Sequence, residues 1–292
     1  MNRAFCGPLC IFLAILAGVA PAGAARPVIL DTDICDDIDD TWALAALLRS
    51  PELDCKLVVT AVGDTQAKAK IVARFLAEAG RADIPVGVGI KQGNGPHRQM
   101  GWVKDYDLAS YAGKVHADGV QALIDVIMNS PTRVTLIAVG PLPNVAEALK
   151  REPRIAEKAD FIGMHGSVFV GYGGSSTPHA EYNVVKDVPA AKKVFTVPWP
   201  MTITPLDTCG LVEAGRKRVT EEKLRHSSTT LFDTVAIYLA VSKDLVEMKE
   251  VPLRVTDDGF TRVEEGAKKV NCAVKWKDLD GYETWLVERL TK

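Results

Sequence analysis

The chain has 292 residues, of which 47% are hydrophobic and 25% are charged, and this is the composition of a globular protein with a substantial core. Its 35 basic and 37 acidic side chains give a formal net charge of -2, so the charge balance does not favour binding to nucleic acid or to an anionic membrane. Small uncharged molecules remain compatible with this composition as substrates or ligands.

The first 24 residues have the pattern of a signal peptide. Arg3 gives a short positive start, Ala4–Ala20 are nearly all apolar, and Ala22–Ala24 fit a small-x-small cleavage site. The apolar run is short for a membrane span. We expect residues 1–24 to be removed and residues 25–292 to be exported, either to the periplasm or out of the cell, without attachment to a membrane.

Apolar runs alternate with amphipathic stretches along the mature chain. In chain order we expect strands and helices at 28–30 (strand), 42–48 (helix), 57–62 (strand), 67–79 (helix), 134–139 (strand), 145–149 (helix), around Ile203 (strand), 229–241 (helix) and 282–290 (helix). Strands that alternate with helices predict a parallel sheet covered on both faces. The expected fold is therefore a single α/β domain with a Rossmann-like, open and mostly parallel sheet, which binds ligands at the carboxyl ends of its strands.

Two regions have no regular pattern. They are the long segment 91–118 and the glycine-rich segment 171–176. Long loops in a compact domain often act as functional lids. Disorder is the alternative interpretation of both segments.

An aspartate cluster follows the first expected strand directly. Six of the ten residues from Asp31 to Asp40 are aspartates: 31, 33, 36, 37, 39 and 40. Clustered carboxylates repel one another, so a fold that gathers them favours a bound cation. Oxygen ligands suit Ca²⁺ or Mg²⁺ rather than zinc or copper. The alternative is a solvated acidic turn in which Asp39 or Asp40 caps the following helix.

The stretch from Val28 to Leu44, with Asp31-Thr32-Asp33 and Asp37-Ile38-Asp39-Asp40, resembles the amino-terminal signature of the inosine–uridine-preferring nucleoside hydrolase family in its longer form. Four further segments resemble family motifs in the same order: 62–65 (Val-Gly-Asp-Thr), 139–144 (Val-Gly-Pro-Leu-Pro-Asn), 180–191 and 232–236 (Phe-Asp-Thr-Val-Ala). The resemblance covers roughly residues 27–240.

The resemblance implies a Ca²⁺ site and a set of catalytic and sugar-binding residues. By analogy, Asp33, Asp40, Asp233 and the main-chain carbonyl of Val139 bind the ion, and Asp33 is also the general base for the attacking water. The two ring hydroxyls of a ribose and water would complete the coordination. Substrate contacts are expected from Asp64, Met164, Glu181 and Asn183, and from either Asp37 or Asp39.

Three departures from the family pattern bear on the leaving group and the sugar. Phe232 stands where well-studied members have a histidine, and a phenylalanine cannot protonate a departing base. Ser175 and Asp64 each stand where the family often has an asparagine. The remaining candidates for a general acid are the histidines 97, 116, 165, 179 and 226, of which His165 and His179 lie closest to matched segments.

The leading functional hypothesis is calcium-dependent hydrolysis of the N-glycosidic bond of ribonucleosides, which releases base and ribose. One alternative is a hydrolase of the same fold for a different riboside or N-glycoside, and another is a calcium-dependent binding protein without turnover. A phosphatase with Asp31 as nucleophile is a further alternative. The expected partner is a small ribonucleoside or riboside, and the oligomeric state, including a homo-oligomer, is left open.

Overall fold

The computed structural model describes residues 24–35, 37–95, 98–212 and 229–291. The expected signal peptide, apart from Ala24, lies outside these residues. Within them, no helix combines the length and the apolar character that a membrane crossing requires.

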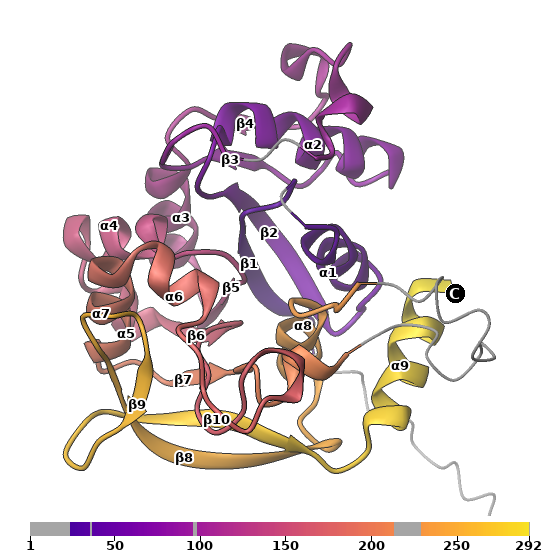
Figure 1. Ribbon diagram of the computed structural model, residues 1–292. Helices are drawn as coiled ribbons and strands as arrows, with labels where there is room; N and C mark the ends of the chain where they lie inside the picture. The colour runs from indigo at the N-terminus through magenta and orange to yellow at the C-terminus, as the bar shows by residue number, and fades with distance from the viewer. Residues whose placement is uncertain (1–23, 36, 96–97, 213–228, 292) are drawn as a thin grey trace, which may run out of the picture.

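A ten-stranded sheet forms the centre of the molecule, in the order β4-β3-β2-β1-β5-β6-β7-β10-β8-β9 (Figure 1). The strands from β4 to β7 pair in parallel, and β10 joins β7 in parallel as well. Their bounds are β1 Arg26–Thr32, β2 Leu53–Thr60, β3 Val86–Val88, β4 Val115–His116, β5 Val134–Ala138, β6 Ala159–Gly163, β7 Met201–Ile203, β8 Val246–Val255, β9 Thr261–Val263 and β10 Lys269–Trp276. The predicted mostly parallel α/β fold is confirmed.

Helices cover both faces of this sheet, as Figure 1 shows. On one face α1, α2, α8 and α9 share a core, and on the other face α3, α4, α5 and α7 share a second core. The helices are α1 Asp39–Leu48, α2 Thr65–Glu78, α3 Gly119–Asn129, α4 Pro143–Arg151, α5 Ile155–Lys158, α6 Tyr182–Lys186, α7 Val188–Thr196, α8 Thr234–Val241 and α9 Leu279–Thr291. Burial on both faces explains why the central strands are continuous apolar runs.

Strand β1 shows how the sequence pattern builds the two cores. Val28 and Leu30 pack into the first core, and Ile29 between them packs into the second. Successive side chains of a strand point to opposite faces, so this run is apolar throughout. The same geometry places Asp31 and Asp33 at the carboxyl end of the central strand.

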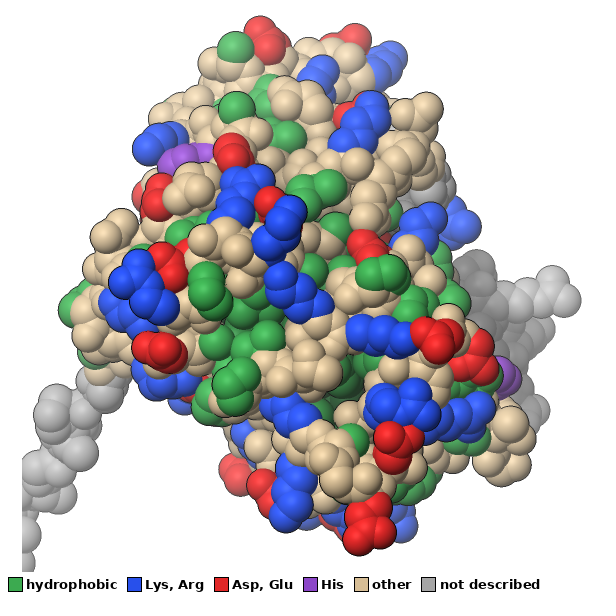
Figure 2. Space-filling model, turned by 90° about the vertical axis from the view of Figure 1, so that its left-hand side faces the viewer, with side chains coloured by type: hydrophobic (Ala, Val, Ile, Leu, Met, Phe, Trp, Pro, Cys, Tyr) green, Lys and Arg blue, Asp and Glu red, His purple; other side chains and the backbone are tan. Residues whose placement is uncertain are grey.

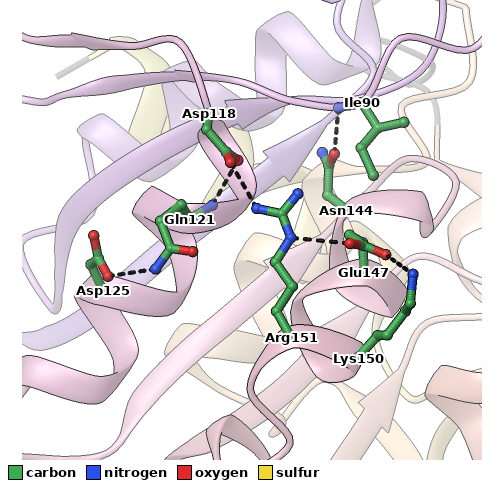
Figure 3. A network of polar contacts seen from close by, with 8 residues as sticks. All are labelled: Ile90, Asp118, Gln121, Asp125, Asn144, Glu147, Lys150 and Arg151. Atoms are coloured by element: carbon green, nitrogen blue, oxygen red, sulfur yellow. Dashed lines mark hydrogen bonds and ion pairs between the residues drawn. The ribbon is translucent and has the colours of Figure 1, made fainter.

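Carboxylates fix the starts of several helices. Asp118 accepts a hydrogen bond from the backbone N–H of Gln121 at 2.9 Å and so caps α3. Arg151 of α4 donates to Asp118 at 2.7 Å and to Glu147 at 3.0 Å, which ties α3 to α4 (Figure 3). Figure 2 shows that basic and acidic side chains are interspersed over the face that carries α4 and α7. This mixture agrees with the nearly neutral charge of the sequence.

The antiparallel end of the sheet was not anticipated. Strands β10 and β8 pair antiparallel, and β9 continues the sheet from β8.

Two boundaries of elements differ from those expected from the sequence. The helix expected over 229–241 is α8, which begins only at Thr234, and the strand expected to reach Val62 ends at Thr60 because Val62 has a positive φ of 56°.

The four cysteines in the described part of the chain are all buried, and no two of them form a disulfide. They are Cys35, Cys55, Cys209 and Cys272.

Candidate functional site

A cavity opens at the carboxyl ends of β1, β5 and β6, which are neighbours in the sheet. Asp33, Val139 and Met164 follow these three strands directly and reach the cavity wall. Its volume is about 230 Å³, which is room for a small molecule rather than a polymer. The described residues that line it are Asp33, Asp37, Asp39, Asp40, Arg98, Val139, Met164, Tyr172, Glu181, Tyr182, Asn183, Phe232 and Asp233.

Three buried carboxylates in the cavity wall form a tight group. Asp39 and Asp40 are the first two residues of α1, and Asp233 stands immediately before α8. One oxygen of each lies within 4.8 Å of the others. The positive ends of two helix dipoles therefore converge on these acids. Neither Asp39 nor Asp40 acts as the N-cap of α1, because Ile38 holds that position.

Burial and mutual repulsion make the charged form of this group costly. Burial raises the pKa of Asp39 to about 6, and the nearby charge of Asp37 adds to the effect. Burial and neighbouring carboxylates raise the pKa values of Asp40 and Asp233 well above the ordinary value. A divalent cation would remove this repulsion, and a cluster of hard oxygen donors suits such an ion. These three residues fit a metal site.

Asp33 shares the cavity but is not one of the three tightly grouped acids. Its charge contributes to the raised pKa values of Asp31, Asp40, Glu181 and Asp233, so it lies amid all four. The structure thus brings Asp33, Asp40 and Asp233 to one cavity, as the resemblance implied, and adds Asp39 to the acids that can hold an ion.

Two residues, Gly140 and Lys68, determine where Asp33 lies in the cavity. A Cβ on Gly140 would stand 2.5 Å from Asp33 Oδ1, so only glycine permits this approach. Lys68 of α2 is fully buried and donates from Nζ to the main-chain carbonyl of Asp33 at 2.6 Å. Its charge also lowers the pKa of Asp40. Sequence reasoning did not identify Lys68, because a lysine in an amphipathic helix gives no sign that it is buried.

Asp31 lies behind the cavity rather than in its wall. Its Oδ2 accepts a hydrogen bond from Asn144 Nδ2 at 2.8 Å, and Asn144 Oδ1 accepts one from the Ile90 N–H at 2.7 Å (Figure 3). Asp31 is fully buried, and burial raises its pKa to about 7. A phosphomonoester in the cavity could not reach this carboxylate, so the geometry argues against the phosphatase alternative.

Glu181 and Asn183 both reach the cavity from the start of α6. Glu181 accepts hydrogen bonds from the N–H groups of Asn183 at 2.7 Å and Gly166 at 2.9 Å. Burial raises its pKa to about 7. Asn183 Nδ2 donates to the carbonyls of Val139 at 2.8 Å and Met164 at 2.9 Å. The Val139 carbonyl that the resemblance assigns to the ion thus already accepts one hydrogen bond.

The other residues expected to contact the sugar, Asp37 or Asp39 and Asp64, lie in different environments. Asp37 lines the cavity, but its side chain is 67% exposed and pairs with Arg98 at 2.8 Å, whereas Asp39 is buried beside Asp40. Asp64 is not one of the described lining residues. It caps α2 through the Ala67 N–H at 3.0 Å and pairs with Lys91 at 3.2 Å. This structure therefore gives Asp64 a helix-capping role and offers no support for a sugar contact.

Aromatic side chains and one arginine complete the cavity wall. Tyr172 lies edge-on to Phe232 at 6.2 Å between ring centroids, and its hydroxyl oxygen accepts a hydrogen bond from the Tyr182 N–H at 2.9 Å. Neither Tyr182 nor Arg98 was singled out in the sequence, although Tyr182 lies in the matched segment 180–191 and Arg98 in the irregular segment 91–118. Tyr172 likewise belongs to the glycine-rich segment that the sequence marked as a candidate functional loop.

None of the described histidines lines the cavity. His165 is fully buried, its Nε2 lies 3.0 Å from the Gly140 carbonyl, and burial lowers its pKa to about 4. His179 Nδ1 accepts the Tyr172 N–H at 3.0 Å while its ring stacks on Tyr172. His116 belongs to β4, which is distant from β1, β5 and β6 in the strand order. His97 and His226 lie outside the described residues.

Comparison with protein families identifies the chain. A family described as inosine-uridine preferring nucleoside hydrolase matches residues 28–285. The chain belongs to this family. The match extends beyond the motifs recognised in the sequence, through the antiparallel strands and into α9. In this member of the family, Asp33 at the end of β1 and the acids at the starts of α1 and α8 line the cavity described above.

Curated nucleoside hydrolases resemble part of the chain. A non-specific ribonucleoside hydrolase RihC of Klebsiella pneumoniae is 34% identical over 180 residues, or 58% of this chain and 57% of that protein. An inosine-uridine preferring nucleoside hydrolase of Leishmania major is 33% identical over 199 residues, or 62% of this chain and 60% of that protein. The chain thus spans less than two thirds of the length of these relatives.

Solved structures share the fold over nearly the whole chain. A plant nucleoside hydrolase has a TM-score of 0.75 at 24% identity, and the match covers 91% of this chain and 99% of that one. A purine-preferring ribonucleoside hydrolase from Gardnerella vaginalis has a TM-score of 0.75 at 20% identity, with coverage of 91% and 98%. These likenesses support the sheet order and the helix layers.

Proposed function

We propose that the protein hydrolyses the N-glycosidic bond of ribonucleosides in a calcium-dependent reaction that releases base and ribose. The observation that carries the proposal is the position of Asp33. It stands at the end of the central strand, beside a buried group of three acids and inside a cavity of small-molecule size. Membership of the nucleoside hydrolase family supports the same reaction.

Residues of the cavity wall would hold the ribose. Glu181 and Asn183 come from one short helix start whose backbone is fixed by their own hydrogen bonds, so both are rigidly placed to contact hydroxyl groups. Asp37 and Asp39 also line the cavity. Of these two, Asp39 belongs to the buried acid group, and Asp37 stands at the solvent side of the cavity.

Asp33 would act as the general base. It takes a proton from water as the water oxygen forms its bond to the anomeric carbon, and the bond to the base breaks with its electron pair on the base. The transition state has oxocarbenium character, as in glycoside hydrolysis, and the surrounding carboxylates stabilise its positive charge.

Asp33, Asp39, Asp40 and Asp233, with the Val139 carbonyl, would hold the Ca²⁺ ion. When bound, Ca²⁺ supplies a positive charge that lowers the pKa of water and binds vicinal hydroxyls.

A second candidate is a hydrolase for a riboside without a nucleobase. It is favoured by Phe232 and by the absence of histidine from the described part of the cavity wall. A protein that binds nucleosides without turnover is a third candidate. Asp33 argues against it, because a pure binding site has no need of a general base.

The test is purified protein with calcium, a panel of purine and pyrimidine ribonucleosides, and other ribosides, with release of reducing sugar as the readout. Ribose from at least one nucleoside supports the proposal. Turnover confined to non-nucleoside ribosides favours the second candidate. Thermal stabilisation by nucleoside without product identifies a binding protein, and no response of either kind contradicts the proposal.

We also propose that the mature chain is exported. The basic start, apolar run and small-residue cleavage site of residues 1–24 support this proposal. Expression of the full chain in a bacterial host, followed by N-terminal sequencing of the periplasmic fraction, should give a mature start at residue 25. Recovery of the uncleaved chain from the cytoplasm alone would contradict export.

A further inference from the structure

One arginine lines a cavity that otherwise carries acids. Six of the described lining residues are carboxylates, and Arg98 is the one cationic side chain among them. Its guanidinium pairs with Asp37 at 2.8 Å, and both side chains are largely exposed, at 71% and 67%. Arg98 therefore stands at the solvent side of the cavity, away from the buried acids that would hold the sugar and the ion.

Three contacts fix the segment of Arg98 to the start of α1. Besides the Arg98–Asp37 ion pair, Gln99 Nε2 donates to the main-chain carbonyl of Asp37 at 2.8 Å, and the Thr41 hydroxyl donates to Gln99 Oε1 at 2.9 Å. Just beyond, Arg74 of α2 stacks on the Trp102 ring at 4.8 Å and donates to its carbonyl. The contacts of Gln99 and Trp102 thus hold the chain next to Arg98 in place, and they position its guanidinium.

The bond cleavage of the proposed function leaves an electron pair on a ring nitrogen of the departing base. Without a proton donor the base leaves as an anion. The described histidines do not reach the cavity, and Phe232 carries no proton to give. Backbone N–H groups donate to both carboxylate oxygens of Glu181 and favour its ionised form, and burial raises the pKa of the Tyr172 hydroxyl, which makes it a poor acid. The cavity acids would repel such an anion, so a cation at the solvent side is the group that can offset its charge.

We infer that the Arg98 guanidinium binds the departing base and stabilises its negative charge, in place of a histidine acid. A guanidinium keeps its proton in proteins, so it acts by charge and by donated hydrogen bonds rather than by proton transfer. The base then takes its proton from solvent after it leaves, and the proton that Asp33 accepts from water returns to solvent. This inference rests on the proposed hydrolase function.

If Arg98 stabilises the departing base, its contribution to kcat should be larger for a leaving group that departs less readily as an anion. A nucleobase is a poor leaving group, whereas 4-nitrophenolate departs readily as an anion. We expect Arg98→Gln to lower kcat on inosine or uridine by about 10–100-fold, less than the loss at a buried oxyanion donor, because an exposed charge is screened. The loss on 4-nitrophenyl β-D-ribofuranoside should be at least about tenfold smaller than the loss on the nucleoside.

Two further variants make the test specific. Arg98→Lys keeps a positive charge and should recover part of the lost nucleoside activity. Arg154→Gln is the matched control, because Arg154 is an exposed arginine that pairs with Glu152 and does not line the cavity. The wild-type rate on nucleosides should also show no decline from pH 7 to pH 9, whereas a histidine acid would lose activity there.

The outcomes separate this inference from the function on which it rests. A wild-type protein that releases no ribose from any nucleoside contradicts the proposed function itself. An active wild type whose Arg98→Gln variant loses equal factors on both substrates, or loses nothing on either, overturns the role of Arg98. A larger loss on the nucleoside, with partial recovery in Arg98→Lys, supports it.

Discussion

At the scale of single residues, two neighbours, Gly140 and Lys68, determine the position of Asp33. Gly140 leaves the space that the Asp33 carboxylate occupies, and Lys68 holds the Asp33 main chain from the other side. Arg98 and Phe232 line the same cavity, and none of the described histidines does. The reactive group and its surroundings are therefore set by different parts of the chain.

Replacing Asp33 by asparagine should remove the general base while keeping the side-chain volume. We expect kcat on a responsive riboside to fall by about 10²–10⁴-fold, the usual contribution of proton transfer. Steady-state kinetics measure the loss, and circular dichroism checks the fold. Asp105→Asn is the control, because Asp105 is an exposed aspartate on the surface. A variant with wild-type kcat would contradict the role of Asp33.

Replacing Gly140 by alanine tests the close approach to Asp33. The new Cβ would stand 2.5 Å from Oδ1 and 2.9 Å from Cβ of Asp33, so the carboxylate must move. We expect at least a tenfold loss of kcat, because a displacement of about 1 Å in a catalytic group can cost about 10²-fold. Gly101→Ala is the control, because nothing lies within 4 Å of a Cβ at that position. Equal activity in the two variants would contradict the expectation.

At the scale of elements, the site forms where strand ends meet helix starts. Strands β1, β5 and β6 deliver Asp33, Val139 and Met164, and helices α1 and α8 deliver the buried acids. Asn144, at the start of α4, connects the ends of neighbouring strands. Its amide donates to Asp31 at 2.8 Å and to the Thr60 carbonyl at 3.1 Å, and its Oδ1 accepts from Ile90.

Replacing Asn144 by alanine should loosen this junction. The change leaves the buried Asp31 carboxyl and the Ile90 N–H without a partner, and each buried polar group left unpaired costs about 1–3 kcal/mol. We therefore expect the free energy of unfolding to fall by about 2–4 kcal/mol in a urea titration. Asn129→Ala, at the end of α3, is the control. A loss below about 1 kcal/mol would show that the junction is not a stabilising element.

At the scale of the whole molecule, the gathered acids link stability to pH and to calcium. Burial raises the pKa of Asp31 from 3.8 to about 7 and that of Glu181 from 4.5 to about 7. Between roughly pH 4 and pH 7 these two carboxyls and the buried group Asp39, Asp40 and Asp233 hold more protons in the folded protein than in the unfolded chain. They outnumber His165, whose lowered pKa acts in the opposite direction. Without metal, the free energy of unfolding should decrease as the pH rises through this window.

Calcium should reverse this trend. The ion competes with protons for the carboxylates, so its stabilisation grows as the pH rises. Thermal unfolding in EDTA and in millimolar CaCl₂, at pH 5 and at pH 7.5, measures both effects. We expect the rise in Tm on adding calcium to be larger at pH 7.5. Equal shifts at the two pH values, or no shift, would contradict binding of calcium by the buried acids. Asp233→Asn should abolish most of the shift.

Much of the fold and part of the site could be predicted from local patterns. The alternation of apolar strands and amphipathic helices indicated the parallel sheet, and the aspartates after the first strand indicated the edge at which the cavity opens. The antiparallel strands β8, β9 and β10 escaped prediction, because short, partly exposed strands at a sheet edge have weak sequence patterns. The role of Asp64 as the cap of α2 was not predicted from the sequence either.

The sequence by itself determined which residues stand at strand ends, because side-chain alternation and strand length are local properties of the chain. Only the tertiary structure decided that Asp39 joins Asp40 and Asp233, that Lys68 is buried beneath Asp33, and that Arg98 faces the same cavity. These encounters depend on how distant helices and loops pack on the sheet. It is packing that turns scattered acids and one arginine into a single site.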